Sequence, residues 1–464
     1  MSFRYEYDTL GRMEVPADAY YGAQTARAVE NFPISSHRFQ RQFIWALALI
    51  KHAAALTNVE LGLLDPIKGE AIAKAAMEVA EGRFDKHFVV DVFQTGSGTS
   101  TNMNANEVIA NRALEILGAA RGDKKIIHPN DHVNMCQSTN DVIPTAMNLA
   151  AVHLIVEKLL PALEKMEKTL EAKADEFRDY VKAGRTHFQD AVPVTFGQEF
   201  SGYAEMIRKG RRRVLNALES LREVPIGGTA TGSGLNAHPD FGQKVVERIN
   251  SLTGLGIRVA DNRFEAMGSR DSCLEASGAL RVIAHSILKI CNDLRIMSSG
   301  PNTGIGELEL PAVQPGSSIM PGKVNPVIVE SAMLAAAQVI GYDAAISAAV
   351  RLGELELNMG LPLIGYDLID SITLLSNTLD NLAEKCIAGI VVNVERARNL
   401  AEKSPALVTA LAPKIGYDNA AKISKKMLES GKSIREILVE EGLADEKSVD
   451  ELLDLRKLAK GGLV

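Results

Sequence analysis

The sequence predicts a protein that is all-α or nearly so. Apolar residues recur at helical spacing over long segments, and the breaks between these segments are polar and often rich in glycine. The expected helix content far exceeds the one third or so that is usual in globular proteins. One helical pattern runs from about 144 to about 180, a length typical of a long bundle or a coiled coil.

The helices are placed by following the chain in order. The first 40 or so residues are expected to be irregular, because prolines and turn residues punctuate them. An apolar stripe that also includes Lys51 begins near Arg41, and Asp65 before Pro66 is a cap followed by proline at the first helical position. Further helices are predicted over 66–81, 107–117, 144–180, 196–221, 241–252, 272–297, 327–350 and 361–387.

Two features interrupt the helical pattern. Pro161 is a candidate kink within the longest helical pattern. Near Asn393 the pattern changes to shorter helices with a mixture of exposed charges, as in a small terminal domain. We therefore predict a small helical domain over 393–464.

Composition and charge narrow the class of protein. Hydrophobic residues make up 46% and charged residues 23% of the chain, as in ordinary soluble proteins. The net charge of −7 argues against a nucleic-acid partner but permits a small anionic substrate, because a site can be locally basic. The N-terminus has no apolar signal core and no apolar run reaches membrane-spanning length, so we expect a cytoplasmic protein without a membrane partner.

The distribution of cysteines and histidines argues against a metal or a cofactor. Cys136, Cys273, Cys291 and Cys386 have no CxxC spacing, so we expect free thiols that mostly fill the core, and no iron–sulfur cluster. No group of His, Cys and carboxylate residues has the spacing of metal ligands.

One predicted loop is rich in glycine, proline and polar residues. Residues 316–326 read Gly-Ser-Ser-Ile-Met-Pro-Gly-Lys-Val-Asn-Pro. The glycines permit backbone conformations closed to other residues, and the prolines fix φ, so the segment is a shaped loop between helices. Backbone N–H groups with one lysine suit an anion, although an ordinary turn explains the same residues equally well.

Other polar stretches make a ligand site the better interpretation. Residues 94–104 lead into an apolar helix, whose exposed N–H groups offer an anion site. Further polar stretches lie at 128–134, 137–141 and 185–190, and 227–234 is rich in glycine.

The loop over 316–326 resembles the signature of the fumarase/aspartase superfamily. The stretches at 96–102, 128–131, 138–141 and 184–187 also resemble it, and their order and spacing are similar to those of class II fumarases. This resemblance implies three domains, here an N-terminal domain over 1–137, a central bundle of long helices over 138–392 and the small domain over 393–464, and a homotetramer whose active sites gather loops from three subunits. It also implies a carbon–oxygen lyase of the tricarboxylic acid cycle that hydrates fumarate to (S)-malate by reversible anti addition, without a cofactor.

The resemblance also assigns catalytic roles. Ser317 matches the general base, which requires a stabilised alkoxide. Lys323, with Asn325, is placed to neutralise the aci-carboxylate formed when the carbon-bound proton is removed. His187, paired with Glu330, passes a proton to or from the leaving hydroxide. Taken alone, these residues have ordinary alternatives: a turn or capping serine, solvated lysine and glutamate, and a structural histidine.

The remaining predicted site residues are contacts to dicarboxylates. Short hydroxyl and amide side chains fix a carboxylate without adding charge, although one or two of them are also expected to cap helices. The predicted substrate contacts are Ser97, Gly98, Thr99, Ser138, Thr139, Asn140, Thr186, Ser318, Val324 and Asn325. A second, peripheral dicarboxylate site is predicted at His128, Pro129, Asn130 and Asp131, for which a structural turn is an equal alternative.

Small departures bear on the substrate. Thr139 stands where fumarases usually have serine, as is common among aspartases, whereas residues 95–99 and Gly322 have the fumarase form. We therefore predict a fumarate hydratase, with aspartate ammonia-lyase as the alternative. A non-enzymatic structural member, like the lens crystallins of the superfamily, is a further alternative that the intact catalytic positions disfavour.

Overall fold

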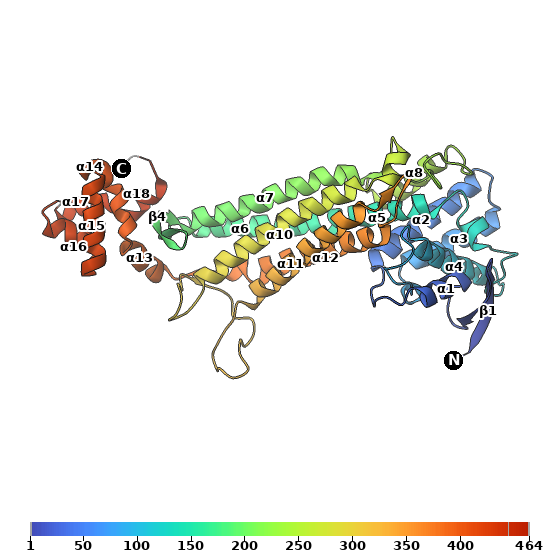
Figure 1. Cartoon of the computed structure of the whole chain (residues 1–464), viewed down its shortest axis with the longest axis horizontal. Helices are drawn as coiled ribbons and strands as arrows, with labels where there is room; N and C mark the ends of the chain where they lie inside the picture. Colours follow the sequence, from blue (N-terminus) through green and yellow to red (C-terminus); the bar gives the residue numbers. More distant parts are fainter. Residues whose placement is uncertain (1, 444, 463–464) are drawn as a thin grey trace. The chain divides into compact units, whose positions relative to one another are not determined.

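The computed structural model describes residues 2–443 and 445–462 and confirms the mainly α fold (Figure 1). The predicted boundaries at 196–221 and 327–350 are reproduced to the residue, because the apolar repeat there ends in polar or proline-containing breaks. The principal helices are α2 (Arg41–Glu60), α3 (Pro66–Ala80), α4 (Thr99–Ile116), α5 (Thr139–Leu154), α6 (Leu160–Glu176), α7 (Phe196–Leu221), α8 (Phe241–Thr253), α10 (Asp271–Met297), α11 (Val327–Val350) and α12 (Leu361–Lys385).

The N-terminal region is more regular than predicted. Strands β1 (Phe3–Asp8) and β2 (Gly11–Pro16) pair antiparallel, and the short helix α1 (Ala23–Asn31) follows. The prediction of an irregular segment is wrong because it gave weight to the prolines. It overlooked that the aromatic residues of β1 alternate with polar ones, which is the period of a strand.

The longest helical pattern contains a local irregularity. Helix α5 passes through a π-helical turn (Ile155–Leu159) into α6. This turn ends two residues before Pro161, whose missing N–H cannot complete an α-helical hydrogen bond. Pro161 therefore marks the irregularity that the sequence predicts, and the chain remains helical on both sides of it.

Contacts between Cα atoms divide the chain into two compact units. The first unit comprises Met1–Pro161, Gly210–Ala284 and Ala336–Ser376, and the second comprises Ala162–Lys209, His285–Ala335 and Asn377–Val464. Several unit boundaries fall inside long helices, so each unit contains parts of them. The division into three domains along the chain remains a prediction.

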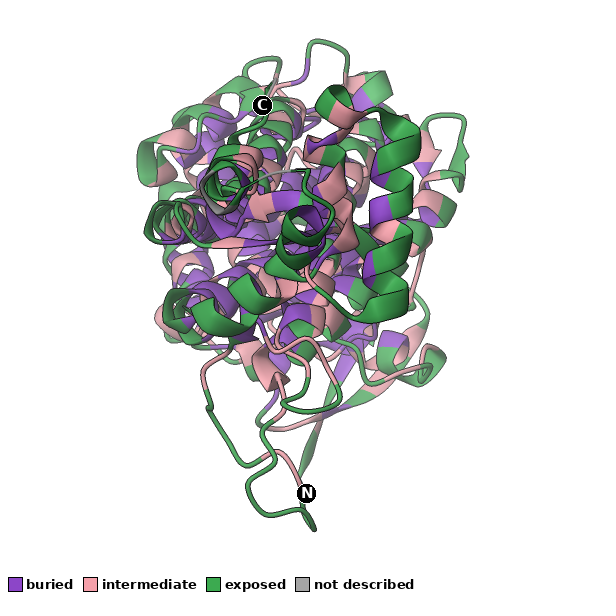
Figure 2. Cartoon of the chain, turned by 90° about the vertical axis from the view of Figure 1, so that its left-hand side faces the viewer, coloured by how far each residue is buried: buried purple, intermediate pink, exposed green. Residues whose placement is uncertain are grey.

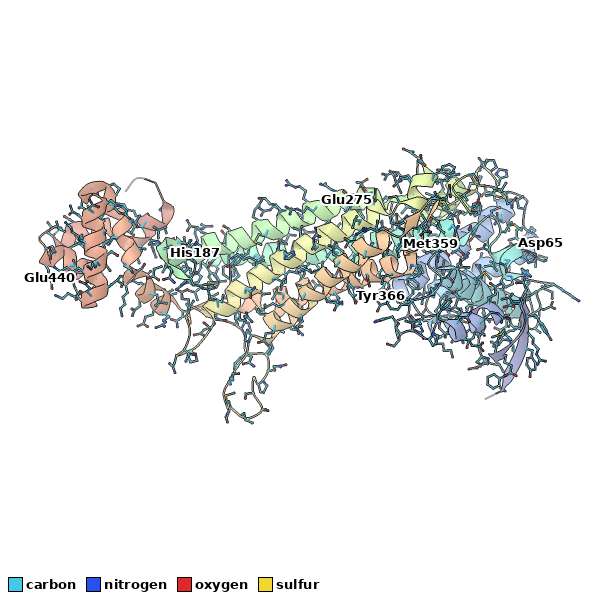
Figure 3. The ribbon with its side chains drawn as sticks, viewed as in Figure 1. Asp65, His187, Glu275, Met359, Tyr366 and Glu440 are labelled. Atoms are coloured by element: carbon cyan, nitrogen blue, oxygen red, sulfur yellow. The ribbon has the colours of Figure 1, made fainter. Side chains whose placement is uncertain are left out.

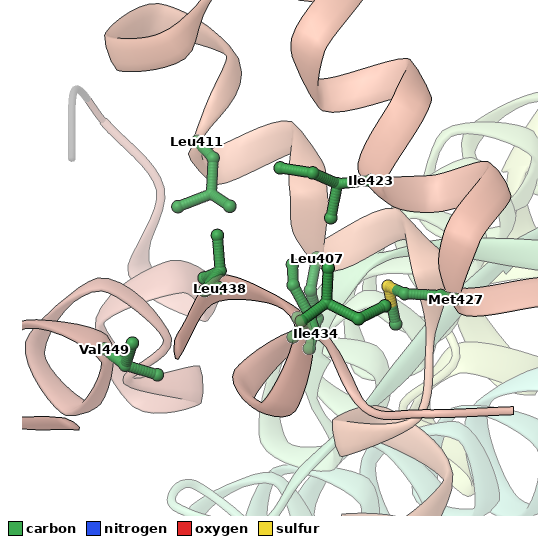
Figure 4. Close-up of a cluster of buried hydrophobic side chains, with 8 residues drawn as sticks. Leu407, Leu411, Ile423, Met427, Ile434, Leu438 and Val449 are labelled. Carbon is green, nitrogen blue, oxygen red and sulfur yellow. The ribbon is translucent and has the colours of Figure 1, made fainter. Parts of the chain in front are cut away.

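The end of the second unit has a hydrophobic core of its own. The 3₁₀ helix Pro405–Ala410 and the helices from α14 (Ala412–Ile415) to α18 (Leu455–Lys460) surround a cluster of buried aliphatic side chains (Figure 4). This core explains the change of sequence character near Asn393, because short helices can bury their apolar faces only against one another. Its members are Leu407, Leu411, Ile423, Met427, Ile434, Ile437, Leu438 and Val449.

Elsewhere, buried side chains occupy the inward faces of the helices (Figure 2). Two helical segments, Thr139–Glu176 and Val327–Val350, are long and apolar enough to cross a membrane by length and composition alone, so the expectation of no such segment is wrong. The most apolar window of the first is 67% buried, as in a core helix, whereas that of α11 is only 28% buried. Helix α11 therefore exposes apolar side chains such as Leu334, which is 75% exposed.

Candidate functional site

The first group of predicted site residues lies in the first unit, where α4 begins. Gly98 adopts a left-handed conformation (φ +81°) directly before Thr99, the first residue of the helix. Gln94 Nε2 donates to Thr101 Oγ1 over 2.7 Å, and the backbone N–H of Thr101 donates to Gln94 Oε1 over 2.9 Å. This reciprocal cap starts the helix at Thr99, well before the predicted start at 107. The hydroxyls of Ser97 and Thr99 lie 2.9 Å apart.

The second group begins α5. Ser138 Oγ accepts from the backbone N–H of Asn140 over 3.2 Å, and Asp141 Oδ1 accepts from the backbone N–H of Ser138 over 2.9 Å, as in a capping box. Asn140 Nδ2 donates to the carbonyl of Ala230 over 2.8 Å. Ser138 therefore has the capping role that the sequence analysis allows for some of these residues.

Packing places the starts of these two helices against each other. A Cβ atom on Gly98 would lie 3.1 Å from the side chain of Ile143 in α5, so glycine allows the close approach. Asn102 Nδ2, in the first turn of α4, donates to Thr139 Oγ1 over 3.0 Å. Each helix N-terminus carries partial positive charge, so the pair suits a carboxylate.

Asp141 joins the glycine-rich stretch to the same cluster. Its Oδ2 accepts from the backbone N–H groups of Gly227 and Thr229, each over 3.0 Å. Burial raises the pKa of Asp141 to about 7, while its backbone hydrogen bonds and Lys51 act in the opposite direction. The stretch at 227–234, which the sequence analysis gives no role, thus anchors the beginning of α5.

A fully buried lysine adjoins these loops. Lys51 in α2 is 0% exposed, and its Nζ donates to Asn134 Oδ1 and Gln137 Oε1, each over 2.9 Å. Burial lowers the pKa of Lys51 to about 7, and the charge of Asp141 opposes this shift. The partners of both groups nevertheless suit the charged forms, because acceptors surround the ammonium and N–H donors surround the carboxylate.

The predicted peripheral site has a clear structural role for one of its residues. His128 Nδ1 accepts from the backbone N–H groups of Asn130 and Asp131 over 3.1 and 3.2 Å, and so caps the short π-helix Pro129–Val133. An accepting Nδ1 places the proton of the neutral ring on Nε2. The turn interpretation accounts for His128, while the side chains of Asn130 and Asp131 are exposed. A second dicarboxylate site remains a prediction.

In the second unit, His187 occupies the tip of a β-hairpin (Figure 3). Strands β3 (Val181–Thr186) and β4 (Gln189–Thr195) are joined by His187 and Phe188, whose φ angles are +55° and +58°. Such angles cost a non-glycine residue on the order of 1 kcal/mol or more and are concentrated at functional sites. Thr186 and His187 are both exposed, so the hairpin presents them to solvent or to a partner.

Buried charges anchor this hairpin along strand β3. Arg185 forms two hydrogen bonds with the fully buried Glu307, Nη1 to Oε2 over 2.8 Å and Nη2 to Oε1 over 2.7 Å. Lys182 Nζ lies 2.9 Å from Glu199 Oε2 and 4.0 Å from Glu307 Oε2. The bidentate geometry fixes orientation as well as distance. It therefore ties the hairpin to the segment that leads into the loop at 316–326.

The loop over 316–326 closes on itself at its base. The backbone N–H of Gly316 donates to the carbonyl of Lys323 over 2.8 Å, and Asn325 Nδ2 donates to the carbonyl of Gly316 over 2.7 Å. A Cβ atom on Gly316 would lie 2.6 Å from both Asn325 N and Lys323 O, so only glycine fits there. Asn325 thus shapes the loop, in addition to the donor role predicted for it.

Ser317 sits just inside this closure. Its Oγ accepts from the backbone N–H groups of Ile319 and Met320 over 3.2 and 3.0 Å. Two N–H donors directed at one hydroxyl oxygen stabilise negative charge on it. The tip of the loop is exposed, with Ile319 84% exposed, so an apolar side chain stands in solvent in the isolated chain.

The other end of the loop lines a pocket of about 710 Å³ in the second unit. Lys323 and Asn325 contribute to its wall, together with Glu330 at the start of α11 and the cations Arg295 and Arg396. Glu309 also lines it, so three cations and two carboxylates face this pocket. The lining has a small excess of positive charge, which permits an anionic ligand.

The expected pair of His187 and Glu330 does not form within the described part of this chain. Both side chains are exposed, and no hydrogen bond or ion pair joins them over residues 2–443 and 445–462. The pairing of His187 with Glu330 remains a prediction.

The predicted residues thus divide into two groups, one in each compact unit. The first unit holds Ser97, Gly98, Thr99, Ser138, Thr139 and Asn140, and also the peripheral residues from His128 to Asp131. The second unit holds Thr186, His187, Ser317, Ser318, Lys323, Val324, Asn325 and Glu330.

Sequence reasoning did not assign a function to several residues that hold the predicted site residues in place. A feature of the sequence could have pointed to Lys51, because it is a charged residue within the apolar stripe of α2. Asp141 had one as well, because it is the third residue after a capping serine. The partners of Lys51 and Glu307 had none, since they lie far away in the sequence.

Two family models match most of the chain. A family model described as Lyase matches residues 11–341, and one described as Fumarase C C-terminus matches residues 407–460. The first of these matches includes all the predicted site residues, which lie between Ser97 and Glu330.

Individual proteins match along almost the full length. A class II fumarate hydratase of Mycobacterium tuberculosis is 51% identical over 464 residues, which cover 99% of this chain and 96% of that protein. A class II fumarate hydratase of Brucella suis is 48% identical over 455 residues and 98% of both chains. A crystal structure of class II fumarase from Schistosoma mansoni superposes with a TM-score of 0.95 at 38% identity, covering 99% of both chains.

Proposed function

Because the chain belongs to the class II fumarate hydratase family of lyases, we propose that it catalyses the reversible hydration of fumarate to (S)-malate. The observation that carries this proposal is the pair of backbone N–H groups directed at Ser317 Oγ, from Ile319 and Met320. A serine with that environment is suited to hold negative charge, as a base acting on carbon requires.

In the malate-to-fumarate direction, Ser317 Oγ takes a proton from the carbon next to a carboxylate. That proton is weakly acidic, and its removal places a second negative charge on the carboxylate. Lys323, at the wall of the pocket, supplies the compensating positive charge as the aci-carboxylate develops. The side chain of Asn325 shapes the loop and has a second N–H available to the substrate.

His187 and Glu330 act on the hydroxide that leaves malate. A histidine oriented by a carboxylate delivers a proton to the departing hydroxide, directly or through a water molecule. The exposed position of His187 on a strained hairpin turn supports this assignment, because the turn presents the ring outward. Neutral groups hold the substrate carboxylates; these are Ser97, Gly98, Thr99, Ser138, Thr139, Asn140, Thr186, Ser318 and Val324.

The active protein is proposed to be a homotetramer whose sites combine loops of different subunits. Helix α11 supports this, because its most apolar window is only 28% buried in the single chain, as expected for a helix covered by other copies. The exposed Ile319 at the tip of the catalytic loop also supports it, because another subunit would cover this side chain. Because the predicted residues are divided between the two compact units, the association of subunits is the step that completes each site.

Ultraviolet absorbance distinguishes this function from its alternatives. Fumarate absorbs through its conjugated double bond, so its loss is followed directly after purified protein is added, with and without ammonium. We expect loss without ammonium, to the same extent in both samples. Loss only with ammonium would identify an aspartate ammonia-lyase, and no loss in either sample would favour a non-enzymatic member of the superfamily.

A further inference from the structure

The ammonium of Lys51 fixes the orientation of two amide side chains. A protonated lysine has three donors and no acceptor, so the amide atoms that face it must be oxygens. Asn134 and Gln137 therefore present Oδ1 and Oε1 to Lys51 Nζ, each over 2.9 Å. The other end of Asn134 agrees with this orientation, because its Nδ2 donates to the carbonyl of Gln137 over 3.1 Å.

The same oxygen of Asn134 also sets the orientation of two residues in α4. Asn102 and Asn106 each direct Nδ2 at Asn134 Oδ1 over 3.2 Å. Both asparagines are buried, with exposed fractions of 1% and 0%, so turning either amide around would set its Oδ1 against Asn134 Oδ1 and leave an acceptor facing an acceptor in the interior.

This order of donors and acceptors ends at a predicted substrate contact. The second N–H of Asn102 Nδ2 donates to Thr139 Oγ1 over 3.0 Å. The hydroxyl oxygen of Thr139 is then an acceptor, and its own hydrogen must point elsewhere. Over residues 2–443 and 445–462, no protein acceptor takes that hydrogen.

We propose that Lys51 is a positioning residue, which acts through Asn134 and Asn102 to keep the Thr139 hydroxyl as a hydrogen-bond donor to a substrate carboxylate. This inference rests on the proposed function, because it takes Thr139 as a contact to the dicarboxylate. Reversed polarity at Asn102 would let the Thr139 hydroxyl donate to an amide oxygen, and the carboxylate would lose that donor.

A buried lysine with only a packing role would not require this arrangement. Taking an ammonium out of water is costly, and an apolar side chain of similar volume serves packing as well or better. The directed chain from Lys51 to Thr139, by contrast, needs a group that cannot accept a hydrogen bond.

A double-mutant cycle between Lys51 and Thr139 tests the proposal in the full-length protein. The variants are Lys51→Met, Thr139→Val and their combination, and the probe is succinate, the saturated dicarboxylate of the same length as fumarate. Its dissociation constant is measured by calorimetry, and kcat and KM for malate are measured in parallel. The matched control is Lys173→Met, which removes another buried lysine that donates to Glu176 and to the carbonyl of Ile390, in the second unit.

We expect Thr139→Val to weaken succinate binding by about 10- to 100-fold, the loss of about one hydrogen bond to a charged group. Lys51→Met should also weaken binding. We expect KM to rise more than kcat falls, because the contact between Thr139 and the substrate carboxylate forms in the bound ground state as well as in the transition state. The combined variant should bind within about twofold of Thr139→Val alone, since coupled residues are not additive. Lys173→Met should leave binding unchanged.

Independent, multiplying effects of the two substitutions would overturn the proposal, and so would unchanged binding in Lys51→Met. If Lys51→Met does not fold, Lys51→Gln replaces it in the cycle. Its amide can turn either an N–H or an oxygen toward Asn134, so it should weaken binding in the same direction as Lys51→Met but by less. A protein that binds succinate but does not hydrate fumarate would contradict the proposed function alone, and the cycle would still measure the coupling. A protein that hydrates fumarate with an additive cycle would contradict only the role of Lys51.

Discussion

Replacing Ser317 with alanine is expected to lower kcat for malate dehydration by about 10²- to 10⁴-fold, the usual contribution of a positioned general base. The apparent affinity should change far less, because a base acts in the transition state and contributes little to holding the substrate. The two backbone N–H groups on Ser317 Oγ stabilise charge only when an oxygen is present there. Steady-state kinetics of the purified variant, with circular dichroism to verify folding, provide the measurement.

Ser318→Ala is the matched comparison for this variant. It removes a neighbouring hydroxyl from the same loop, and its expected effect is weaker binding with a much smaller change in kcat. Near-normal kcat in Ser317→Ala would show that serine is not the base, and His187 or an ordered water would then have to take the proton.

Replacing Lys323 with alanine is expected to damage both kcat and the apparent affinity. An ammonium that faces a carboxylate helps in the ground state, and it helps more as the second negative charge develops. Lys323→Arg should restore little activity, because the planar guanidinium does not match a site built for a point charge. The same steady-state measurements in the malate-to-fumarate direction distinguish these effects.

Two results would contradict this account of Lys323. A change in apparent affinity alone would make the lysine a uniform binder that does not stabilise the aci-carboxylate. Full activity in Lys323→Arg would show that a cation of any shape suffices.

The sequence predicted the fold best where one apolar repeat decides the structure. Helices α7 and α11 were placed to the residue, because each is a long amphipathic or apolar segment between clear breaks. The N-terminal hairpin and the early start of α4 were missed. The first depends on an alternation over only a few residues, and the second on the side chain of Gln94, which caps the helix from outside it.

The sequence predicted which residues form the candidate site, but not how they are arranged in space. The motifs identified Ser317, Lys323 and His187 through their resemblance to a family. They did not reveal that Asn325 closes the base of its own loop, because the hydrogen bond from its side chain to the carbonyl of Gly316 depends on how the loop folds. Helix capping was expected for one or two of the hydroxyl residues, and the structure identifies Ser138 as one of them. The buried network around Lys51 was missed for a different reason, since its partners lie more than eighty residues away along the chain.

The central claim is that each active site combines Ser317 of one subunit with His187 of another. The most direct test is to co-express Ser317→Ala and His187→Asn chains that carry different tags, and to assay the mixed tetramers isolated through both tags. Each variant alone should be nearly inactive. Random assembly should give about a quarter of the sites both wild-type residues, so the mixed tetramers should recover a corresponding share of fumarate hydration. Mixed tetramers as inactive as either parent would contradict the account, because both residues would then belong to the same chain.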